Sequence, residues 1–341
     1  MFTYSVVVPV YNRPDEMGEL LESLSRQTLK VFDLIVVEDG SAISSEEVVK
    51  HYSNTVELDY FYKKNTGPGD SRNFGMSKAK GDYIVFFDSD CVIPEDYFEK
   101  LDKSLSQNPL DAWGGPDDAH PSFSNTQKAI NHVMTSFFTT GGIRGRKKSV
   151  GKFQPRSFNM GLKKEVYQEV GGFCEIHPGE DPDLSFRIMK AGYTTGLISE
   201  AKVYHKRRID FGKFVKQVYK FGATRIILSK WHKGTFKPIY AIPSLFSLGV
   251  LGCMFLCVVV SSLFVVPVLL FGLLIFLECL ILTKKIKVSV LAVPAAFLQM
   301  FGYGYGFLEA LFHVIILNKN EKKSLPKLFF KEVNDYRETL K

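Results

Sequence analysis

The chain has 341 residues, enough for about two domains, and its 43 Lys and Arg against 36 Asp and Glu give a net charge of +7. Charged residues occur throughout 1–237, whereas the 40 residues 238–277 contain no Asp, Glu, Lys, Arg or His. As a helix, that stretch would measure about 60 Å, twice the hydrocarbon thickness of a bilayer. These features exclude a purely soluble enzyme, a disordered chain and a small disulfide scaffold.

The first 90 residues alternate strand-like and helix-like segments. Four short apolar runs predict strands, at 4–10, 32–37, 58–62 and 82–87. Helix patterns follow the first three, starting at Pro14, near Ser44 and after the turn Gly67-Pro68-Gly69. This alternation predicts a mostly parallel sheet with helices on both faces. Right-handed crossovers then place a ligand crevice at the carboxyl ends of the strands.

A basic segment precedes the apolar part. Residues 202–237 hold eleven Lys or Arg against one acid, Asp210, which predicts a cytoplasmic juxtamembrane segment facing anionic lipid headgroups. From Phe211 to Phe221, apolar residues recur at a spacing of three and four. This amphipathic pattern suits a helix on the membrane surface or one packed on the soluble core. Because the stripe lacks a nucleic-acid reading module, we expect no nucleic-acid partner.

The apolar part contains two predicted spans, 239–260 and 263–282. A third apolar run, 288–308, is broken by Pro294 and three glycines, and lysines flank it on both sides. The positive-inside rule places both of its ends in the cytoplasm. We therefore expect a re-entrant or interfacial third segment, with a true third span as the alternative. Because no cleavable signal peptide is expected, the soluble domain is predicted to face the cytoplasm from a multi-pass protein of the cytoplasmic membrane.

Acidic clusters follow the predicted strands. Asp88-Ser89-Asp90 comes after the fourth strand, and residues i and i+2 of an extended chain point to the same side. The pair suits a hard divalent cation that binds phosphate oxygens, with a solvated turn as the alternative. In Glu180-Asp181-Pro182-Asp183, a carboxylate could act as general base, although Asp181 also suits the cap of a helix with Pro182 as its first residue.

Four other residues are candidates for the same crevice. Asp39 could contact a nucleotide base or ribose, or form an Asx turn. Arg72 and Asn73, near a helix N-terminus, could contact a pyrophosphate. His205 could bind a metal through its neutral imidazole, or be a buried, hydrogen-bonded histidine. The five cysteines form no C-x-x-C pair, so neither a zinc site nor a disulfide framework is indicated.

The order of these motifs resembles that of the family 2 glycosyltransferases, which have a GT-A fold. The resemblance extends from residue 1 to about 208. It rests on the following stretches: Val6-Val-Val-Pro-Val-Tyr-Asn12, Val37-Glu-Asp-Gly-Ser41, Gly67-Pro-Gly-Asp-Ser-Arg-Asn73, Asp88-Ser-Asp90, Asn159-Met-Gly-Leu-Lys-Lys-Glu165, Gly171-Gly-Phe173, Gly179-Glu-Asp-Pro-Asp-Leu-Ser-Phe-Arg187 and Val203-Tyr-His205.

The resemblance implies a role for each motif. Asp39 holds the nucleotide base, Asp181 is the catalytic base, and a divalent cation, Mg²⁺ or Mn²⁺, is the cofactor. The implied metal ligands are Asp90, Asp88 and His205. Residues implied on the donor side are Pro9, Tyr11, Asn12, Asp39, Arg72, Asn73, Asp88 and Ser89. Those implied on the acceptor side are Asn159, Glu180 and Asp183.

Three features depart from the family pattern. Glu38 stands where Asp is more usual. Asp70 places a negative charge in the glycine-rich turn, near the expected phosphates. No Q-x-x-R-W follows His205, where the local sequence is Gln217-Val-Tyr-Lys-Phe221. Processive synthases differ there, so the transfer of a single sugar is favoured.

The resemblance and the membrane part together predict an inverting glycosyltransferase. It would move one sugar from a nucleotide diphosphate sugar, with a UDP-sugar favoured, to a hydroxyl of a lipid-linked or growing glycan at the cytoplasmic membrane face. The expected parts are a GT-A domain (1–208), a basic amphipathic segment (209–237), a membrane region (238–317) and a charged tail (318–341). One alternative is a polyprenyl-phosphate glycosyltransferase, and the other is a catalytically inactive nucleotide-sugar-binding membrane scaffold. The first would use a basic acceptor pocket lined by Arg144, Arg146, Lys147 and Lys148.

Overall fold

A computed structural model of the chain describes residues 1–118, 123–140, 153–206, 210–331 and 333–337. The chain divides into two compact units, each built from separated segments. The first comprises Met1–His120, Lys147–Lys206 and Phe329–Lys341, and the second comprises Pro121–Arg146 and Arg207–Leu328. The four-part division in chain order stays a prediction. The basic residues predicted to line a phosphate acceptor pocket lie outside the described residues: Arg144, Arg146, Lys147 and Lys148.

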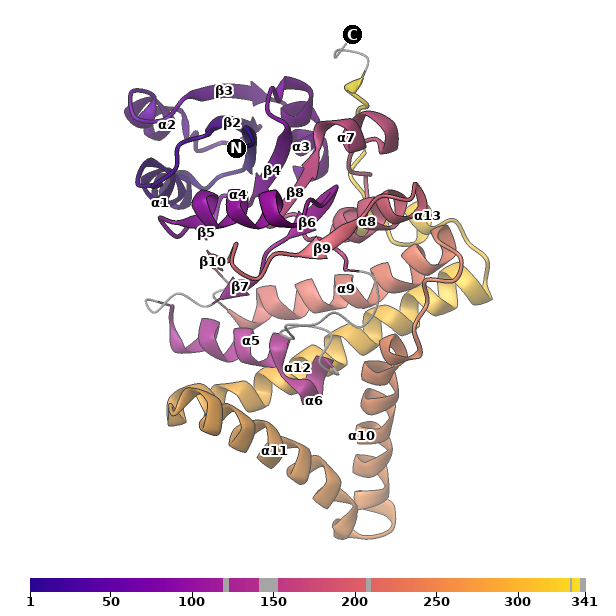
Figure 1. The fold of residues 1–341 in the computed structure, drawn as a ribbon. Coiled ribbons are helices and arrows are strands. Elements are labelled where there is room, and N and C mark those ends of the chain that lie inside the picture. The colour runs from indigo at the N-terminus through magenta and orange to yellow at the C-terminus, as the bar shows by residue number, and fades with distance from the viewer. Residues whose placement is uncertain (119–122, 141–152, 207–209, 332, 338–341) are drawn as a thin grey trace. The chain divides into compact units, whose positions relative to one another are not determined.

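The main sheet of the first unit has seven strands in the order β3-β2-β1-β4-β8-β6-β9 (Figure 1). The first four of these are mutually parallel, β8 runs antiparallel to β4 and β6, and β9 is parallel to β6. The strands are β1 (Tyr4–Val10), β2 (Phe32–Asp39), β3 (Leu58–Lys63), β4 (Tyr83–Phe87), β6 (Ala112–Gly114), β8 (Asn159–Lys163) and β9 (Thr195–Leu197). The four apolar runs form the parallel part, which confirms the predicted mostly parallel sheet.

Helices cover both faces of this sheet because alternate strand residues point to opposite sides. On one face Val6 and Val8 pack with α1 and α4, and on the other Val7 packs with α3, α7 and α8. A proline in the first turn begins both α1 and α3. The helices of the first unit are α1 (Pro14–Ser25), α2 (Glu46–Tyr52), α3 (Pro68–Lys78), α4 (Tyr97–Gln107), α7 (Lys164–Val170) and α8 (Glu180–Lys190).

A second, three-stranded sheet has the order β5-β10-β7. Its strands are β5 (Cys91–Val92), β7 (Asp117–Asp118) and β10 (Val203–His205). β10 runs antiparallel to β5, with His205 opposite Cys91, and parallel to β7. This pairing brings a residue from late in the unit beside the segment that follows β4.

The second unit is helical. Its α-helices are α5 (Asn125–Thr135), α6 (Phe137–Thr140), α9 (Phe211–Trp231), α10 (Ile242–Val259), α11 (Val266–Thr283), α12 (Ile286–Ala310) and α13 (Glu321–Ser324). Three short 3₁₀ turns are η1 (Pro238–Ala241), η2 (Ser262–Val265) and η4 (Pro326–Leu328), and α12 continues into a π-helical segment, η3 (Leu311–Ile316).

Three helical stretches of the described chain are long and apolar enough to cross a membrane: Pro238–Val259, Ser262–Thr283 and Ile286–Ile316. The first two have mean hydropathies of 2.3 and 2.8 and only 11% of their most apolar windows buried. Their exposed leucine, valine and phenylalanine side chains form the kind of surface that lipid covers. The third has a mean hydropathy of 1.5 and is 44% buried, because α9, α5, α10 and α11 pack against it.

The glycines of the third apolar run bring two helices close together. α12 is continuous from Ile286 to Ala310 and contains Pro294, so proline and glycine do not divide it as the sequence suggested. A side chain at Gly302 would lie 2.8 Å from Val218 of α9, and one at Gly306 would overlap the carbonyl oxygen of Tyr219. The amphipathic helix predicted after Asp210 is therefore α9, and its buried side packs on α12.

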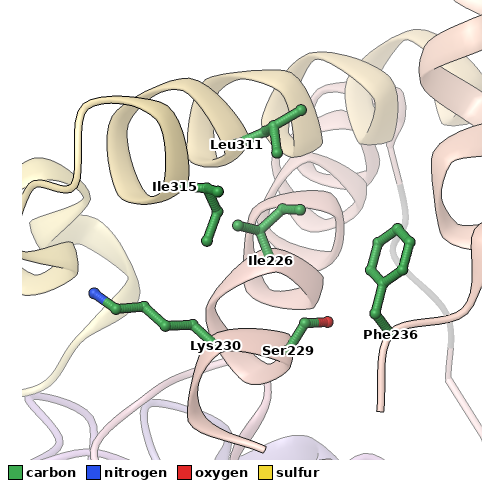
Figure 2. Close-up of a pocket in the computed structure, with 6 residues that line it drawn as sticks. All are labelled: Ile226, Ser229, Lys230, Phe236, Leu311 and Ile315. Carbon is green, nitrogen blue, oxygen red and sulfur yellow. The ribbon is translucent and has the colours of Figure 1, made fainter. Parts of the chain in front are cut away.

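A cavity of about 230 Å³ lies between α9 and η3 in the second unit. Apolar side chains from Ile226, Leu311 and Ile315 form its wall, together with Phe236 from the segment after α9 (Figure 2). Lys230 stands at its edge, where its ammonium lies 2.9 Å from a carboxylate oxygen of Glu321. None of the lining residues is among the predicted site residues.

Candidate active site

The predicted site residues start from one edge of the main sheet. β1 lies between β2 and β4, and all three run parallel. Their carboxyl ends therefore meet at the same edge. Asn12 follows β1, Asp39 ends β2 and Asp88 follows β4. Their position at one edge of the sheet is thus a consequence of the strand order.

Arg72 connects the two acidic motifs. Its guanidinium, buried on α3, lies 2.6 Å from a carboxylate oxygen of Asp88 and 3.3 Å from one of Glu180. Burial alone would lower the pKa of Arg72, but Asp88 and Glu180 outweigh it and raise that pKa. Residues 88 and 180 are distant in sequence, so this one cation places the start of α8 beside the end of β4.

The pKa values of the two neighbouring carboxylates at the start of α8 are shifted in opposite directions. Burial favours the neutral form of Glu180, but His177 (2.9 Å) and Arg72 outweigh it and lower the pKa to about 2. Burial and the negative charge of Glu180 raise the pKa of Asp181 to about 6, although Arg156 and Arg72 act in the other direction. A carboxylate that binds a proton near neutral pH is suited to general base catalysis. α8 begins at Glu180 after Gly179, so Asp181 lies inside the first turn rather than at the cap.

Asp90 sits in a second cluster at the same edge. One of its carboxylate oxygens pairs with Arg13, and the other lies 3.1 Å from Nε2 of His205. Burial acts to raise the pKa of Asp90, but His205 and Arg13 outweigh it and hold that pKa well below its usual range. His205 also lies 3.8 Å from Asp88 and stacks on the ring of Phe158 at 5.0 Å. The pairing of β10 with β5 brings His205 beside Asp90.

The residues present fit a divalent cation. Nε2 of His205 lies 3.1 Å from a carboxylate oxygen of Asp90 and 3.8 Å from one of Asp88. Two carboxylates and an imidazole are ligand types that Mn²⁺ or Mg²⁺ accepts. Cys91 also lies within reach of Asp90 and His205. However, burial raises the pKa of its thiol well above the usual value, and the thiol donates to the carbonyl of Phe158. The oxygen and imidazole ligands therefore suit a hard metal better than a thiolate site would.

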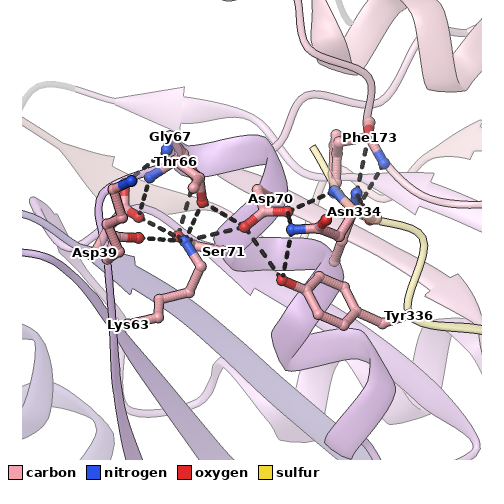
Figure 3. A network of polar contacts seen from close by, with 11 residues as sticks. Asp39, Lys63, Thr66, Gly67, Asp70, Ser71, Phe173, Asn334 and Tyr336 are labelled. Carbon is pink, nitrogen blue, oxygen red and sulfur yellow. Dashed lines mark hydrogen bonds and ion pairs between the residues drawn. The ribbon is translucent and has the colours of Figure 1, made fainter. Parts of the chain in front are cut away.

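The carboxylate of Asp39 accepts three hydrogen bonds from within the protein. Its Oδ1 accepts from the ammonium of Lys63 (2.7 Å) and from the backbone N–H of Thr66 (3.0 Å). Its Oδ2 accepts from the backbone N–H of Gly67 (3.0 Å) (Figure 3). These bonds fix the carboxylate against the turn that opens α3.

The segment after β1 is shaped by Asn12, which has a positive φ of 53°. Its side-chain oxygen accepts from the N–H groups of Ala42 and Ile43, and its own N–H donates to Ser41. The carboxylate of Glu38 accepts from Ser41 and from the N–H of Ser45. Asn12 and Glu38 thus hold the loop after β2. Among the other predicted donor-side residues, Tyr11 is 51% exposed, whereas Pro9 and Ser89 are buried.

Three predicted site residues, Asn73, Asn159 and Asp183, form hydrogen bonds with other residues of the first unit. The amide of Asn73 exchanges hydrogen bonds with the backbone of Phe173 and donates to Asn334. Asn159 is completely buried, accepts from Tyr97 and donates to Ala201. The carboxylate of Asp183 accepts two bonds from Arg187 on the next turn of α8. Direct contact of these three with donor or acceptor stays a prediction.

Four residues of the site were not predicted from the sequence: Arg13, Lys63, His177 and Asp117. Arg13 pairs with Asp90, and Lys63 pairs with Asp39. His177 pairs with Glu180, and a carboxylate oxygen of Asp117 lies 3.9 Å from His205. The sequence did contain an indication for Arg13 and Lys63, because each lies at or just after the carboxyl end of a predicted parallel strand. None existed for Asp117, whose position depends on the small sheet.

Comparison with known proteins supports the fold. Among solved structures, the mannosyltransferase PcManGT from Pyrobaculum calidifontis, in complex with GDP-Man and Mn²⁺, superposes with a TM-score of 0.61 over 87% of each chain, at 14% identity. At that identity the likeness concerns the fold, and it confirms the predicted GT-A architecture.

Relatives are also found by sequence. The chain is 40% identical over 209 residues to an uncharacterized glycosyltransferase of Haemophilus influenzae, covering 59% of this chain and 67% of that protein. It is 27% identical over 215 residues to the minor teichoic acid biosynthesis protein GgaB of Bacillus subtilis, covering 61% of this chain and 23% of GgaB. It spans only 15% of an uncharacterized glycosyltransferase of Rickettsia bellii, to which it is 38% identical over 104 residues. The model of the glycosyl transferase family 2 matches residues 5–171, and together with the Haemophilus influenzae relative this match shows that the chain belongs to glycosyl transferase family 2.

Proposed function

We propose that this glycosyltransferase moves a single sugar, with inversion, from a nucleotide diphosphate sugar to a hydroxyl of a lipid-linked or growing glycan. The observation that carries the proposal is the buried guanidinium of Arg72 between Asp88 and Glu180. It places the Asp88-Ser89-Asp90 motif and the Glu180-Asp181 motif around one centre. We take the first motif as donor-binding and Asp181 as the base, and direct displacement at the anomeric carbon requires both within reach of one centre.

Asp181 is proposed as the general base. As the acceptor oxygen attacks the anomeric carbon, its proton passes to the Asp181 carboxylate. The bond from that carbon to the diphosphate oxygen breaks, and the diphosphate leaves with the electron pair. Because attack and departure are on opposite faces, the configuration inverts. The raised pKa of Asp181, about 6, makes it a stronger base than an ordinary Asp while leaving it mostly ionised at pH 7.

Asp88, Asp90 and His205 are proposed to hold Mn²⁺ or Mg²⁺, which would neutralise charge on the leaving diphosphate when bound. Asp90 stays ionised because His205 and Arg13 lower its pKa. Arg72 orients Asp88 through their short ion pair. Asp39 is proposed to contact the nucleotide base, and a UDP-sugar is the favoured donor.

The membrane region is proposed to anchor the catalytic unit at the cytoplasmic face. Three apolar helical stretches support membrane association, and the lysines between and after them favour a cytoplasmic side for those ends. An acceptor held in the same bilayer would reach the site at a raised effective concentration. The relative GgaB is named for minor teichoic acid biosynthesis, which supports a glycan-type acceptor.

The proposal is tested with the full chain in detergent or nanodiscs. A panel of UDP-, GDP- and dTDP-sugars is screened for protection against thermal unfolding, with and without Mn²⁺. The donor that protects is then used, as labelled sugar, with a lipid-linked oligosaccharide and separately with polyprenyl phosphate. We expect Mn²⁺-dependent protection and transfer to the hydroxyl acceptor, with little transfer by Asp181→Asn.

Each other outcome has a definite meaning. Transfer to polyprenyl phosphate alone, undiminished in Asp181→Asn, would replace the proposal with the phosphate-acceptor alternative, because an ionised phosphate needs no base. Protection by a donor without any transfer would favour the inactive scaffold. Retention of configuration in the product would exclude direct displacement.

A further inference from the structure

A described segment after η4 packs against the turn that opens α3. We call residues 329–331 and 333–337 the C-terminal strap. Phe329 forms a β-bridge with Ile176, and the N–H of Phe330 donates to the carbonyl of Glu175 at 3.0 Å. The ring of Phe330 lies over Gly67, where an added Cβ would be 2.5 Å from the ring. Gly67 also has a φ of +99°, so both the turn conformation and the strap require a glycine there.

The strap contacts Asp70, one of the residues that depart from the family pattern. Asp70 is completely buried. Its Oδ1 accepts from the backbone N–H of Asn334 at 2.7 Å and from the side-chain amide of Asn334 at 3.1 Å. Its Oδ2 accepts from the hydroxyl of Tyr336 at 3.3 Å (Figure 3). The ring of Tyr336 rests edge-on against Phe74 of α3, 5.5 Å between centroids.

On its other side Asp70 meets the partners of Asp39. Its Oδ2 accepts from the hydroxyl of Thr66 and lies 3.0 Å from the ammonium of Lys63. The same ammonium lies 2.7 Å from Oδ1 of Asp39. One cation therefore serves two buried carboxylates. Figure 3 shows the chain of contacts from Asn334 through Asp70 and Lys63 to Asp39.

Whether the ammonium of Lys63 stays close to Asp39 depends on how many other donors bond to the carboxylate of Asp70. A buried carboxylate attracts every available donor, and the attraction is strong where water is excluded. With three neutral donors from the strap, Asp70 leaves Lys63 in close contact with Asp39. Without them, the ammonium would move toward Asp70, and Asp39 would lose the bond that orients its Oδ1.

We propose that the C-terminal strap positions the donor site, with Asn334 and Tyr336 fixing Asp39 through Asp70 and Lys63. The proposal rests on the proposed function, because it takes Asp39 as the contact for the nucleotide base. Asn334 and Tyr336 are positioning residues, since they reach Asp39 only through other side chains. Disturbing the strap is expected to weaken nucleotide binding and to leave the metal cluster of Asp90 and His205 unchanged.

The experiment measures two affinities of the full chain: that for UDP in the presence of Mn²⁺, and that for Mn²⁺ alone. GDP and dTDP are measured in parallel, and the nucleotide that the wild type binds best is used for the variants. Asn334→Asp places a second carboxylate against Asp70 and should weaken nucleotide binding about tenfold, because hydrogen bonds to charged groups have about this effect. Tyr336→Phe removes only a hydroxyl and should weaken it about threefold. The affinity for Mn²⁺ should stay within about twofold, because both changes lie outside the metal cluster.

Rescue and control variants separate positioning from general loosening. Adding Asp70→Asn to Asn334→Asp removes the repulsion and should restore nucleotide binding to within about threefold of wild type. Asp335→Asn changes an exposed strap residue that pairs with Arg337 and serves as the matched control. If Asn334→Asp fails to fold, the Tyr336→Phe result decides the question.

The possible failures are distinguishable. If the wild type binds no nucleoside diphosphate, both the proposed function and this inference are overturned. If it binds one and both strap variants bind equally well, the inference alone is overturned. Tighter binding by the variants would also overturn it, since the strap would then obstruct the site. A parallel loss of Mn²⁺ affinity would reduce the strap to a general structural element.

Discussion

The raised pKa of Asp181 predicts how the transfer rate responds to acid. A general base acts only when deprotonated. With a pKa of about 6, about nine-tenths of the Asp181 carboxyl groups are ionised at pH 7 and about one-tenth at pH 5. The rate at saturating donor and acceptor should therefore fall roughly tenfold between these pH values. An Asp with its ordinary pKa near 3.9 would lose less than about a tenth of its activity over the same range.

The structure also predicts a substitution that shifts the acidic side of the pH–rate profile. After burial, the charge of Glu180 is the largest influence that raises the pKa of Asp181. Glu180→Gln removes that charge, so the midpoint should shift to lower pH and more activity should survive at pH 5. Glu165→Gln, an exposed change at the start of α7, should leave the midpoint in place.

The assay measures initial rates from pH 4.5 to 8 at constant ionic strength, with saturating Mn²⁺. His177 and His205 lie close to the carboxylates, so nucleotide binding needs its own measurement at each pH. The affinity for nucleotide is therefore followed over the same pH values, so that loss of binding is separated from loss of the base. The assignment of Asp181 as the base would be refuted if the midpoint of the pH–rate profile were the same in Glu180→Gln as in the wild type. It would also be refuted if the residual rate of Asp181→Asn still fell at acidic pH with the same midpoint.

Three further predictions address the metal, the packing and the topology. Asp90→Ala should remove the Mn²⁺-dependent part of nucleotide affinity, at least about tenfold, as measured by titration with and without Mn²⁺. Gly222→Val would overlap the carbonyl oxygen of Tyr303 and should lower the free energy of unfolding by about 1–3 kcal/mol, seen in thermal melts against Thr224→Ser. Lys322→Cys should react with an impermeant thiol reagent only after cells are opened; labelling of intact cells would contradict a cytoplasmic end after α12.

The sequence was sufficient to predict the half of the fold that apolar runs and turn residues determine. β1, β2, β3 and β4 are short apolar segments between helices, and their parallel order follows from right-handed crossovers. With these strands parallel and β1 between β2 and β4, Asp39 and Asp88 lie at the same edge of the sheet. The local residues left a general base at Glu180–Asp183 and a metal ligand at His205 beside plainer alternatives, and the family resemblance favoured Asp181 as the base and His205 as the metal ligand.

Contacts between segments far apart in sequence could not be predicted from local patterns. His205 reaches Asp90 only because β10 pairs with β5, and strands of two or three residues give almost no periodic signal. α12 was expected to be broken at Pro294, but its glycines allow α9 to pack closely and the helix continues. In a helix surrounded by other helices, close packing compensates for the unfavourable propensity of glycine and proline.

The position of Asp70 explains why its charge is compatible with the proposed phosphate site. Successive residues of a helix are separated by about 100°, so Asp70 and Arg72 of α3 point in nearly opposite directions. Arg72 reaches Asp88, on the side proposed for metal and diphosphate, whereas Asp70 reaches Lys63 and the strap. The negative charge is therefore directed away from the side proposed for the phosphates, and the cost of burying it is offset by Lys63, Thr66 and the strap. A departure from the family motif in the donor turn is thus matched by a second feature about 260 residues later, and substitutions at Asp70 and Asn334 should have coupled effects on nucleotide affinity.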